Sequence, residues 1–453
     1  MSHNRENFGS LTTAIFAMAG SAIGLGNIWR FPYIVGEYGG AAFILIYILA
    51  TMLVSLPIFV AEVTLGRRSR SSAYGSMQKL RPDDRRWKLA GIMSVLIPMV
   101  IVSYYSVVGG WSVDYLGKAL ASEFISEDPS TVASLFGDFI SNPWLPLVMQ
   151  MLFLLATLVI VALGVKSGIE KFSKYSIPVL FVLILVMCIY SISLPGAGQG
   201  VRYLLHPDFS QISPRSFAYA LGQSFFSLSL GAGTIVTYGS YMRSRENIIQ
   251  TSAGTAVSDL LFALLAGLAI MPAVFAAGIE PGAGPGLIFQ TIPYIFSSMG
   301  ASMPVVGTVI SVVFFLTVVV AALTSSISLV EVGVAHLNEK YGLSRIKACI
   351  VVFVLCSSLG VLCSLSFGPL SSFTIFGKTI FVFCDWLISN MMMPLLALFT
   401  TLFIGFALKR SEVRDEITNS GTVNGKVFPV FYFILKWVAP VFIIVIMVTN
   451  FIL

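Results

Sequence analysis

The sequence predicts an all-α membrane protein that crosses the bilayer many times. Of its 453 residues, 57% are hydrophobic and only 11% are Asp, Glu, Lys or Arg, against about 25% charged residues in an ordinary soluble domain. The mean hydropathy is +0.90. With 35 Phe, 17 Met and so few charges, polar groups could not cover the surface of a soluble protein. The composition therefore excludes a soluble enzyme and a nucleic-acid-binding protein.

Apolar runs define the predicted membrane helices, since one span needs about 20 mostly apolar residues. Eleven spans are expected, near residues 10–36, 40–65, 89–119, 143–163, 172–194, 216–242, 252–278, 302–335, 346–366, 374–407 and 428–451. The loop after the second span is strongly basic, and the loop after the third is acidic. The positive-inside rule then places the basic loops and the N-terminus in the cytoplasm. An odd number of spans places the C-terminus outside, and the rule also accounts for the net charge of +6.

Two predicted spans contain helix-weakening residues at mid-depth. Residues 20–27 read Gly-Ser-Ala-Ile-Gly-Leu-Gly-Asn, and residues 227–233 read Ser-Leu-Ser-Leu-Gly-Ala-Gly. One such segment is equally consistent with close helix packing through small residues. Two of them, five helices apart, favour broken helices in a 5+5 inverted repeat, because irregular backbone at this depth must line a cavity. We expect a single transmembrane domain over 1–453, with repeats near 10–194 and 216–407 and an extra helix near 428–451.

The five cysteines all lie in or beside apolar segments. Their spacing matches neither a disulfide framework nor a zinc site. We therefore expect them to be buried and inert.

The most specific motif lies in the first predicted span. Residues 24–32 read Gly-Leu-Gly-Asn-Ile-Trp-Arg-Phe-Pro and are followed by Gly39-Gly40. This run resembles the first-helix signature of the neurotransmitter:sodium symporter family. Matching features follow in order along the chain, at Tyr104-Tyr105, residues 222–231, residues 323–326 and Asp385. The resemblance implies the bacterial amino-acid transporter branch in its eleven-helix form, located in the bacterial inner (plasma) membrane.

Oxygen-bearing side chains near the two breaks suit a hard cation such as sodium, which prefers oxygen ligands. The resemblance implies two sodium ions and no organic cofactor. The first ion would be held with the substrate carboxylate by Ala22, Asn27, Ser227 and Asp259. The second would be held by Gly20, Ile23, Ala321, Thr324 and Ser325. On sequence alone, Thr324 and Ser325 could instead bond back to their own helical turn.

The substrate pocket follows from the same resemblance. Its expected residues are Ala22, Leu25, Gly26, Ile101, Tyr105, Phe226, Ser227, Ser229, Ala232, Ser325 and Leu329. The amide groups of Leu25 and Gly26, at the positive end of a half-helix, would hold a carboxylate. Monoamine-carrying relatives have Asp where this chain has Gly24, so the substrate is expected to bring its own carboxylate. Ala232 stands where many relatives have a bulky side chain, which favours a large hydrophobic or aromatic amino acid.

Charged residues within membranes are costly and usually face functional cavities. Arg30 and Asp385 resemble the outer gate pair of the family, and Arg5 and Glu339 resemble the inner one. Glu62 is either interfacial or functional, and Tyr104 is expected in the core. We expect Glu170 to pair with Arg345. Gly168 and Pro178 match a spacing at which relatives unwind the fifth helix.

These features together predict sodium-coupled uptake of a hydrophobic or aromatic amino acid by alternating access. Asp259, with Ala263 four residues later, predicts independence from chloride, since a fixed carboxylate would replace the anion used by other relatives. Asp259 is also expected to carry a proton on the return step. No catalytic constellation is visible, so an enzyme is not expected.

The alternative is a non-cycling amino-acid sensor with the same site, which predicts a fused signalling domain or altered gates. A channel is disfavoured by the paired gates. The expected partners are the amino acid, sodium ions and the lipid bilayer, in a monomer or homodimer, with no nucleic acid.

Overall fold

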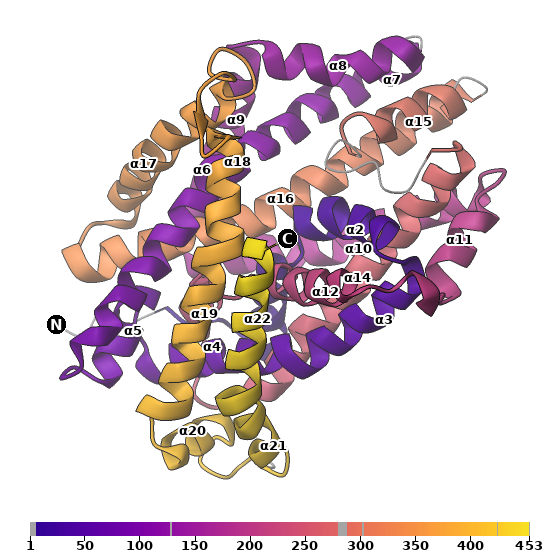
Figure 1. Ribbon diagram of the computed structural model, residues 1–453. Coiled ribbons are helices and arrows are strands. Elements are labelled where there is room, and N and C mark those ends of the chain that lie inside the picture. Colours follow the sequence, from indigo (N-terminus) through magenta and orange to yellow (C-terminus); the bar gives the residue numbers. More distant parts are fainter. Residues whose placement is uncertain (1–5, 127–128, 280–287, 301–302, 424, 453) are drawn as a thin grey trace.

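The computed structural model describes residues 6–126, 129–279, 288–300, 303–423 and 425–452, and this part of the chain is almost entirely helical (Figure 1). Nine helices in it are long and apolar enough to cross a membrane. A further pair, Leu11–Ala22 and Gly26–Glu37, passes the same test together and is bent by 55°. The predicted all-α polytopic fold is confirmed.

The membrane helices are built from α-helical segments and short π-helical turns, the latter labelled η. In chain order they are α1 (Leu11–Ala22), η1 (Gly26–Arg30), α2 (Phe31–Glu37), α3 (Gly40–Ala50), η2 (Thr51–Ser55), α4 (Leu56–Ser69), α6 (Lys88–Leu120), α9 (Leu145–Ala162), η4 (Val165–Glu170), α10 (Lys171–Ser193), α12 (Pro214–Ser227), α13 (Thr234–Gly239), α14 (Ile248–Ala276), α16 (Pro304–Tyr341), α17 (Arg345–Leu365), α18 (Ile380–Leu387), η7 (Ile388–Met392), α19 (Met393–Leu402), η8 (Phe403–Ala407), α21 (Phe428–Phe433), η9 (Ile434–Val438) and α22 (Ala439–Ile452).

Shorter elements lie in the connections. They are α5 (Ala73–Leu80), the 3-10 turn η3 (Arg85–Trp87), α7 (Glu123–Ser126), α8 (Pro129–Ser141), α11 (Gly198–Leu205), the 3-10 turn η5 (Phe209–Gln211), α15 (Thr291–Gly300), β1 (Thr374–Ile375), β2 (Lys378–Thr379) and α20 (Arg410–Ile417). The strands form one antiparallel hairpin in which Thr374 faces Thr379. The predicted helix at 374–407 is wrong at its start, because this hairpin precedes α18.

Both predicted helix breaks are present. The first lies between α1 and η1, and α1 begins with a capping box in which Ser10 and Thr13 bond each other's backbone N–H. The second separates α12 from α13, which have 14 and 6 residues and are each too short to cross a bilayer. Within it Gly231 has a φ of 73°. A Cβ at Gly231 would lie 2.0 Å from the Met393 carbonyl oxygen, so only glycine fits this turn.

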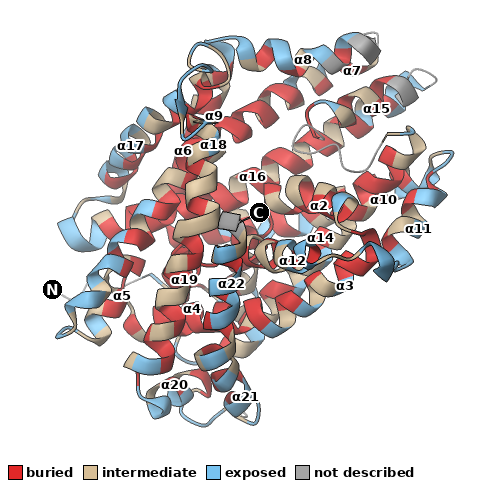
Figure 2. Cartoon of the chain, viewed as in Figure 1, coloured by how far each residue is buried: buried red, intermediate tan, exposed pale blue. Residues whose placement is uncertain are grey.

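The connections gather at two opposite ends of the helix bundle. In Figure 1, α5, α20 and α21 lie at one end and α7, α8 and α15 at the other. Between them α16 packs along α6, and α14 packs against α10 and α1. Buried residues fill the interior of this bundle, and exposed residues lie on its outer faces (Figure 2). Many of these exposed residues are large and apolar, such as Leu49 and Val182, as expected for faces that contact lipid.

All five cysteines are buried and free of disulfides. The expectation that they are buried and form no disulfide framework is confirmed.

Candidate functional site

The break in the first helix exposes backbone groups that a continuous helix would pair. The Gly24 N–H has turned to the side chain of Asn27, donating to Oδ1 at 3.1 Å. The carbonyl oxygen of Ile23 accepts from the hydroxyl groups of Thr324 and Ser325 on α16. Such freed groups are what ion and substrate sites within membranes are built from.

One polar cluster joins the two breaks to α14. Asn27 donates through Nδ2 to Asp259 Oδ1 at 2.8 Å and to Ser227 Oγ at 3.2 Å. Ser227 donates to the other oxygen of Asp259, Oδ2, at 2.7 Å. All three side chains are almost completely buried. The structure thus brings together the three side chains expected at the first sodium site. Ala22, the fourth residue expected there, ends α1.

A second polar cluster joins the first break to α16. Thr324 Oγ1 donates to the carbonyl oxygens of Ile23 at 3.2 Å and Ala321 at 2.9 Å. Ser325 Oγ lies 3.2 Å from the Ile23 oxygen and 3.5 Å from the Gly20 oxygen. The five residues expected at the second sodium site therefore form one network. Thr324 also makes the back-bond to its own turn that the sequence left open. The Ser325 hydroxyl instead contacts the carbonyl oxygens of Gly20, Ser21 and Ile23 across the break.

Several of the expected substrate residues contact one another or the two helix breaks. The Leu25 N–H donates to the Tyr105 hydroxyl at 3.3 Å, so two groups expected to hold a carboxylate face each other. A Cβ at Gly26 would lie 3.1 Å from the Phe226 ring. Ser229 crosses between the breaks and donates to the Ser21 carbonyl oxygen at 2.9 Å. The remaining wall residues Ile101, Ala232 and Leu329 are buried.

Two further residues stabilise the breaks, and sequence reasoning did not assign their contacts. Glu62 on α4 is buried and accepts the Gly231 N–H at 2.8 Å, which decides against an interfacial position. Gln223 on α12 donates through Nε2 to the Gly26 carbonyl oxygen at 3.3 Å. A polar residue within an apolar run was the available signal in both cases, but it does not identify the partner.

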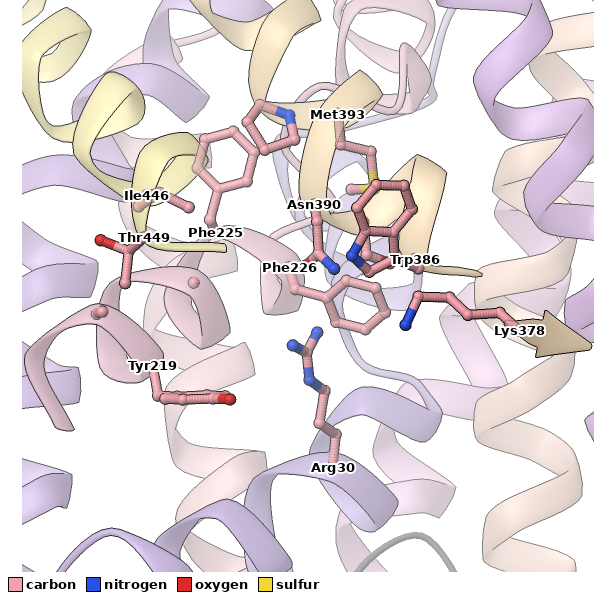
Figure 3. A pocket seen from close by; sticks show the side chains of 14 residues that line it. Arg30, Tyr219, Phe225, Phe226, Lys378, Trp386, Asn390, Met393, Ile446 and Thr449 are labelled. Atoms are coloured by element: carbon pink, nitrogen blue, oxygen red, sulfur yellow. The ribbon is translucent and has the colours of Figure 1, made fainter. Parts of the chain in front are cut away.

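A cavity of about 330 Å³ borders Phe226 and Arg30 and is lined by α12, the β-hairpin, α18–α19 and α22 (Figure 3). The Arg30 guanidinium lies 4.8 Å from the centre of the Phe226 ring. Asp385 accepts from Ser389 Oγ at 3.1 Å. Within the described residues no ion pair joins Arg30 to Asp385, so the expected outer gate contact is absent from this conformation. Tyr104, expected in the core, packs edge-on against Phe381 with ring centres 5.7 Å apart.

The side that the sequence predicts to be cytoplasmic differs from the prediction in one contact. Glu170 does not pair with Arg345, and that prediction is wrong. Arg345 pairs with Glu331, which is completely buried on α16 and needs a cation, while Glu170 accepts the Gly9 N–H at 3.0 Å. Of the expected inner gate pair, Arg5 lies outside the described residues. Glu339 accepts from the Ser72 N–H at 2.6 Å and from the Ser71 hydroxyl.

The turn expected to unwind is irregular in the structure. Gly168 lies in the π-helical turn η4, and Pro178 lies within α10. A Cβ at Gly168 would lie 2.0 Å from the Ile160 carbonyl oxygen. The glycine therefore allows the turn to pack directly on the end of α9.

The chain is similar over nearly its whole length to known sodium-dependent transporters and to a solved structure. The profile of the sodium:neurotransmitter symporter family matches residues 5–129 and 140–453. A sodium-dependent transporter of Bacillus subtilis, YhdH, is 38% identical over 95% of this chain and 94% of its own length. A sodium-dependent transporter of Haemophilus influenzae is 36% identical over 98% of both chains. The crystal structure of MhsT in complex with L-phenylalanine superposes with a TM-score of 0.89 at 40% identity, covering 99% of this chain and 100% of that one.

Proposed function

Because the chain belongs to the sodium:neurotransmitter symporter family, we propose that it takes up a hydrophobic or aromatic amino acid together with sodium ions by alternating access. Its similarity to sodium-dependent transporters shows that it is a multi-pass, sodium-dependent transporter and not an enzyme. We assign it to a bacterial plasma membrane, with the N-terminus and basic loops in the cytoplasm and the C-terminus outside.

The observation that carries the proposal is the second polar cluster. Thr324 and Ser325 direct two hydroxyl groups at the Ile23 carbonyl oxygen, 3.2 Å from each. Neutral oxygens converging on a broken helix inside a membrane suit a hard monovalent cation. Sodium bound there would tie the first helix to α16, and its release would free the two helices to separate.

The substrate assignment rests on the other end of the same break. The Leu25 N–H and the Tyr105 hydroxyl lie together, and either can donate to a carboxylate. Gly24 offers no side-chain carboxylate of its own, so an amino acid is favoured over a monoamine. The buried Ala232 and Ile101 add small and apolar walls, and the similarity to MhsT, solved with L-phenylalanine, supports a hydrophobic or aromatic side chain.

Asp259 is proposed to make transport independent of chloride. Its carboxylate is in hydrogen-bond contact with Asn27 and Ser227, and the nearby Ala263 has no side-chain group that could bind an anion. A carboxylate and a sodium ion a few Å apart attract by about 4 kcal/mol at an effective dielectric constant of 20. The fixed charge can therefore do the work of a bound anion, and it can take up a proton when the empty carrier returns.

The energetics allow steep accumulation. One sodium ion moving down a tenfold gradient and about 150 mV releases roughly 5 kcal/mol. Two ions, as proposed, would double this value.

The test is a panel of labelled amino acids, offered to the purified protein in vesicles with and without a sodium gradient. Accumulation of Phe, Trp, Tyr or Leu only with inward sodium supports the proposal. Saturable binding without accumulation of any of them would instead indicate a sensor.

A further inference from the structure

A groove on the outer surface of the bundle lies beside the start of α10. Its volume is about 460 Å³, and its walls come from α9, from η4 with α10, and from α16. The lining is mostly apolar and includes Leu163, Phe172, Val179 and Val320, together with Lys171. Lys171 begins α10, and Val179 lies eight residues further on, about 12 Å along the helix axis.

This groove faces the lipid. Leu163 and Tyr175, both in its lining, are 62% and 60% exposed. Val165–Ser193 forms one apolar span. Only 39% of its 18-residue apolar stretch is buried inside the protein. In a membrane, acyl chains therefore contact this surface.

The same region carries more positive than negative charge. Lys166, Lys171 and Lys174 are all exposed, and no ion pair within the described residues involves them. The two carboxylates placed at this turn offset part of this charge but bond elsewhere: Glu6 accepts the Val165 N–H at 2.8 Å, and Glu170 accepts the Gly9 N–H. Basic side chains at the edge of an apolar groove, on the side predicted to be cytoplasmic, match the chemistry of an anionic lipid headgroup.

We propose that this groove is a binding site for an anionic glycerophospholipid of the inner leaflet. The phosphate is held by Lys171, with Lys166 and Lys174 adding to the local potential. One acyl chain runs along the apolar wall towards Val179 and Val320. The long lysine side chain keeps its ammonium group at the headgroup level while its methylene groups cover apolar surface.

The position of the groove gives such a lipid a consequence for transport, and this part rests on the proposed function. The opposite face of α10 carries Ser173 and Ile177, which lie within 3.6 Å of a Cβ built at Gly20, as does Thr324. Gly20 and Thr324 belong to the second polar cluster. A lipid in the groove therefore stabilises the packing of η4 and α10 against that cluster. It slows the movement of these two segments that releases sodium to the cytoplasmic side.

Lipid binding can be measured without any assay of transport. The full chain is placed in nanodiscs of phosphatidylcholine containing a minor fraction of phosphatidylglycerol, and native mass spectrometry measures the lipid that it retains. Lys171→Gln should lower phosphatidylglycerol retention about five-fold, the factor that corresponds to about 1 kcal/mol for one basic residue at an anionic surface. Lys171→Arg should retain the lipid. Val179→Trp, which fills the apolar part of the groove, should lower retention with every charge intact.

The matched control is Lys347→Gln, which removes an exposed lysine at the start of α17, outside the groove. Equal phosphatidylglycerol retention by wild type and Lys171→Gln would overturn the proposal. It would also be overturned if wild type retained phosphatidylcholine as well as it retains phosphatidylglycerol. The effect on transport is tested by substrate exchange in vesicles with and without phosphatidylglycerol, where the lipid should slow wild type but not Lys171→Gln. If lipid retention depends on Lys171 but the lipid does not change the exchange rate, the proposed effect of the lipid on sodium release is refuted. Absence of exchange in every lipid would count against the proposed function and leave the binding result intact.

Discussion

The space around Gly24 gives the sharpest test of the substrate site. A Cβ at this position would lie 2.3 Å from Ser325 Oγ, 3.2 Å from Ser325 Cβ and 3.2 Å from the Tyr105 hydroxyl oxygen. Gly24→Ala therefore pushes one methyl group between the second polar cluster and the proposed carboxylate site. Neither neighbour can move freely, because Ser325 contacts Ile23 and Tyr105 contacts Leu25.

Inserting a methyl group into a packed interior costs about 1 to 3 kcal/mol. If the bound state bears this cost, the affinity for the amino acid falls about 5- to 150-fold. The assay is equilibrium binding of the labelled substrate to purified protein in saturating sodium. Gly117→Ala is the matched control, because nothing lies within 4 Å of a Cβ at that helical glycine, and it should bind as wild type does.

A double variant separates the steric effect from other causes. Ser325→Ala removes the atom nearest to the new methyl group, so Gly24→Ala with Ser325→Ala should unfold at a higher temperature than Gly24→Ala alone. Wild-type affinity in Gly24→Ala would refute the packing argument. An unfolding temperature of the double variant that is merely the sum of the two single effects would refute it as well.

Three further outcomes are expected. Wild-type uptake should be the same in sodium gluconate as in sodium chloride and should vary with internal pH; a large loss on removing chloride would reject the role given to Asp259. Ala232→Phe should shift uptake from aromatic to small aliphatic amino acids, and an unchanged ratio of tryptophan to glycine uptake would contradict the pocket. Arg67→Gln should destabilise the protein by about 3 kcal/mol in thermal unfolding, because the buried Arg67 bonds Glu416 Oε1 at 2.6 Å and the Glu246 carbonyl oxygen at 2.5 Å. Arg68→Gln should change stability by under about 1 kcal/mol, since its side chain is 26% exposed and its carboxylate contacts are 3.7 and 3.8 Å long, and equal effects of the two substitutions would refute this difference.

The sequence predicted the helical breaks and their polar surroundings well because these features depend on local composition. Glycine and serine in the middle of an apolar run weaken a helix wherever it packs. The oxygen donors Thr324 and Ser325 were identifiable through a motif resemblance, and the structure places them against the break at Ile23.

Partner choice among charged residues could not be predicted in the same way. Glu331 and Arg345 are joined across the turn between α16 and α17, and Arg67 meets Glu416 from 349 residues away. Each pair is fixed by how whole helices pack, which single-residue patterns do not encode. Glu62 was ambiguous for the same reason, since its contact with the Gly231 N–H requires the second break to lie beside α4.

Sodium bound by Thr324 and Ser325 is proposed to drive accumulation of the amino acid. The most direct measurement is uptake of the labelled amino acid into vesicles under an inward sodium gradient, for wild type and for Thr324→Ala with Ser325→Ala. The control pair is Ser311→Ala with Thr317→Ala, two hydroxyl groups that bond back to their own turns on the same helix. We expect the control to accumulate substrate as wild type does and the Thr324–Ser325 variant to lose sodium-driven accumulation. Wild-type rate and sodium dependence in that variant would contradict the claim.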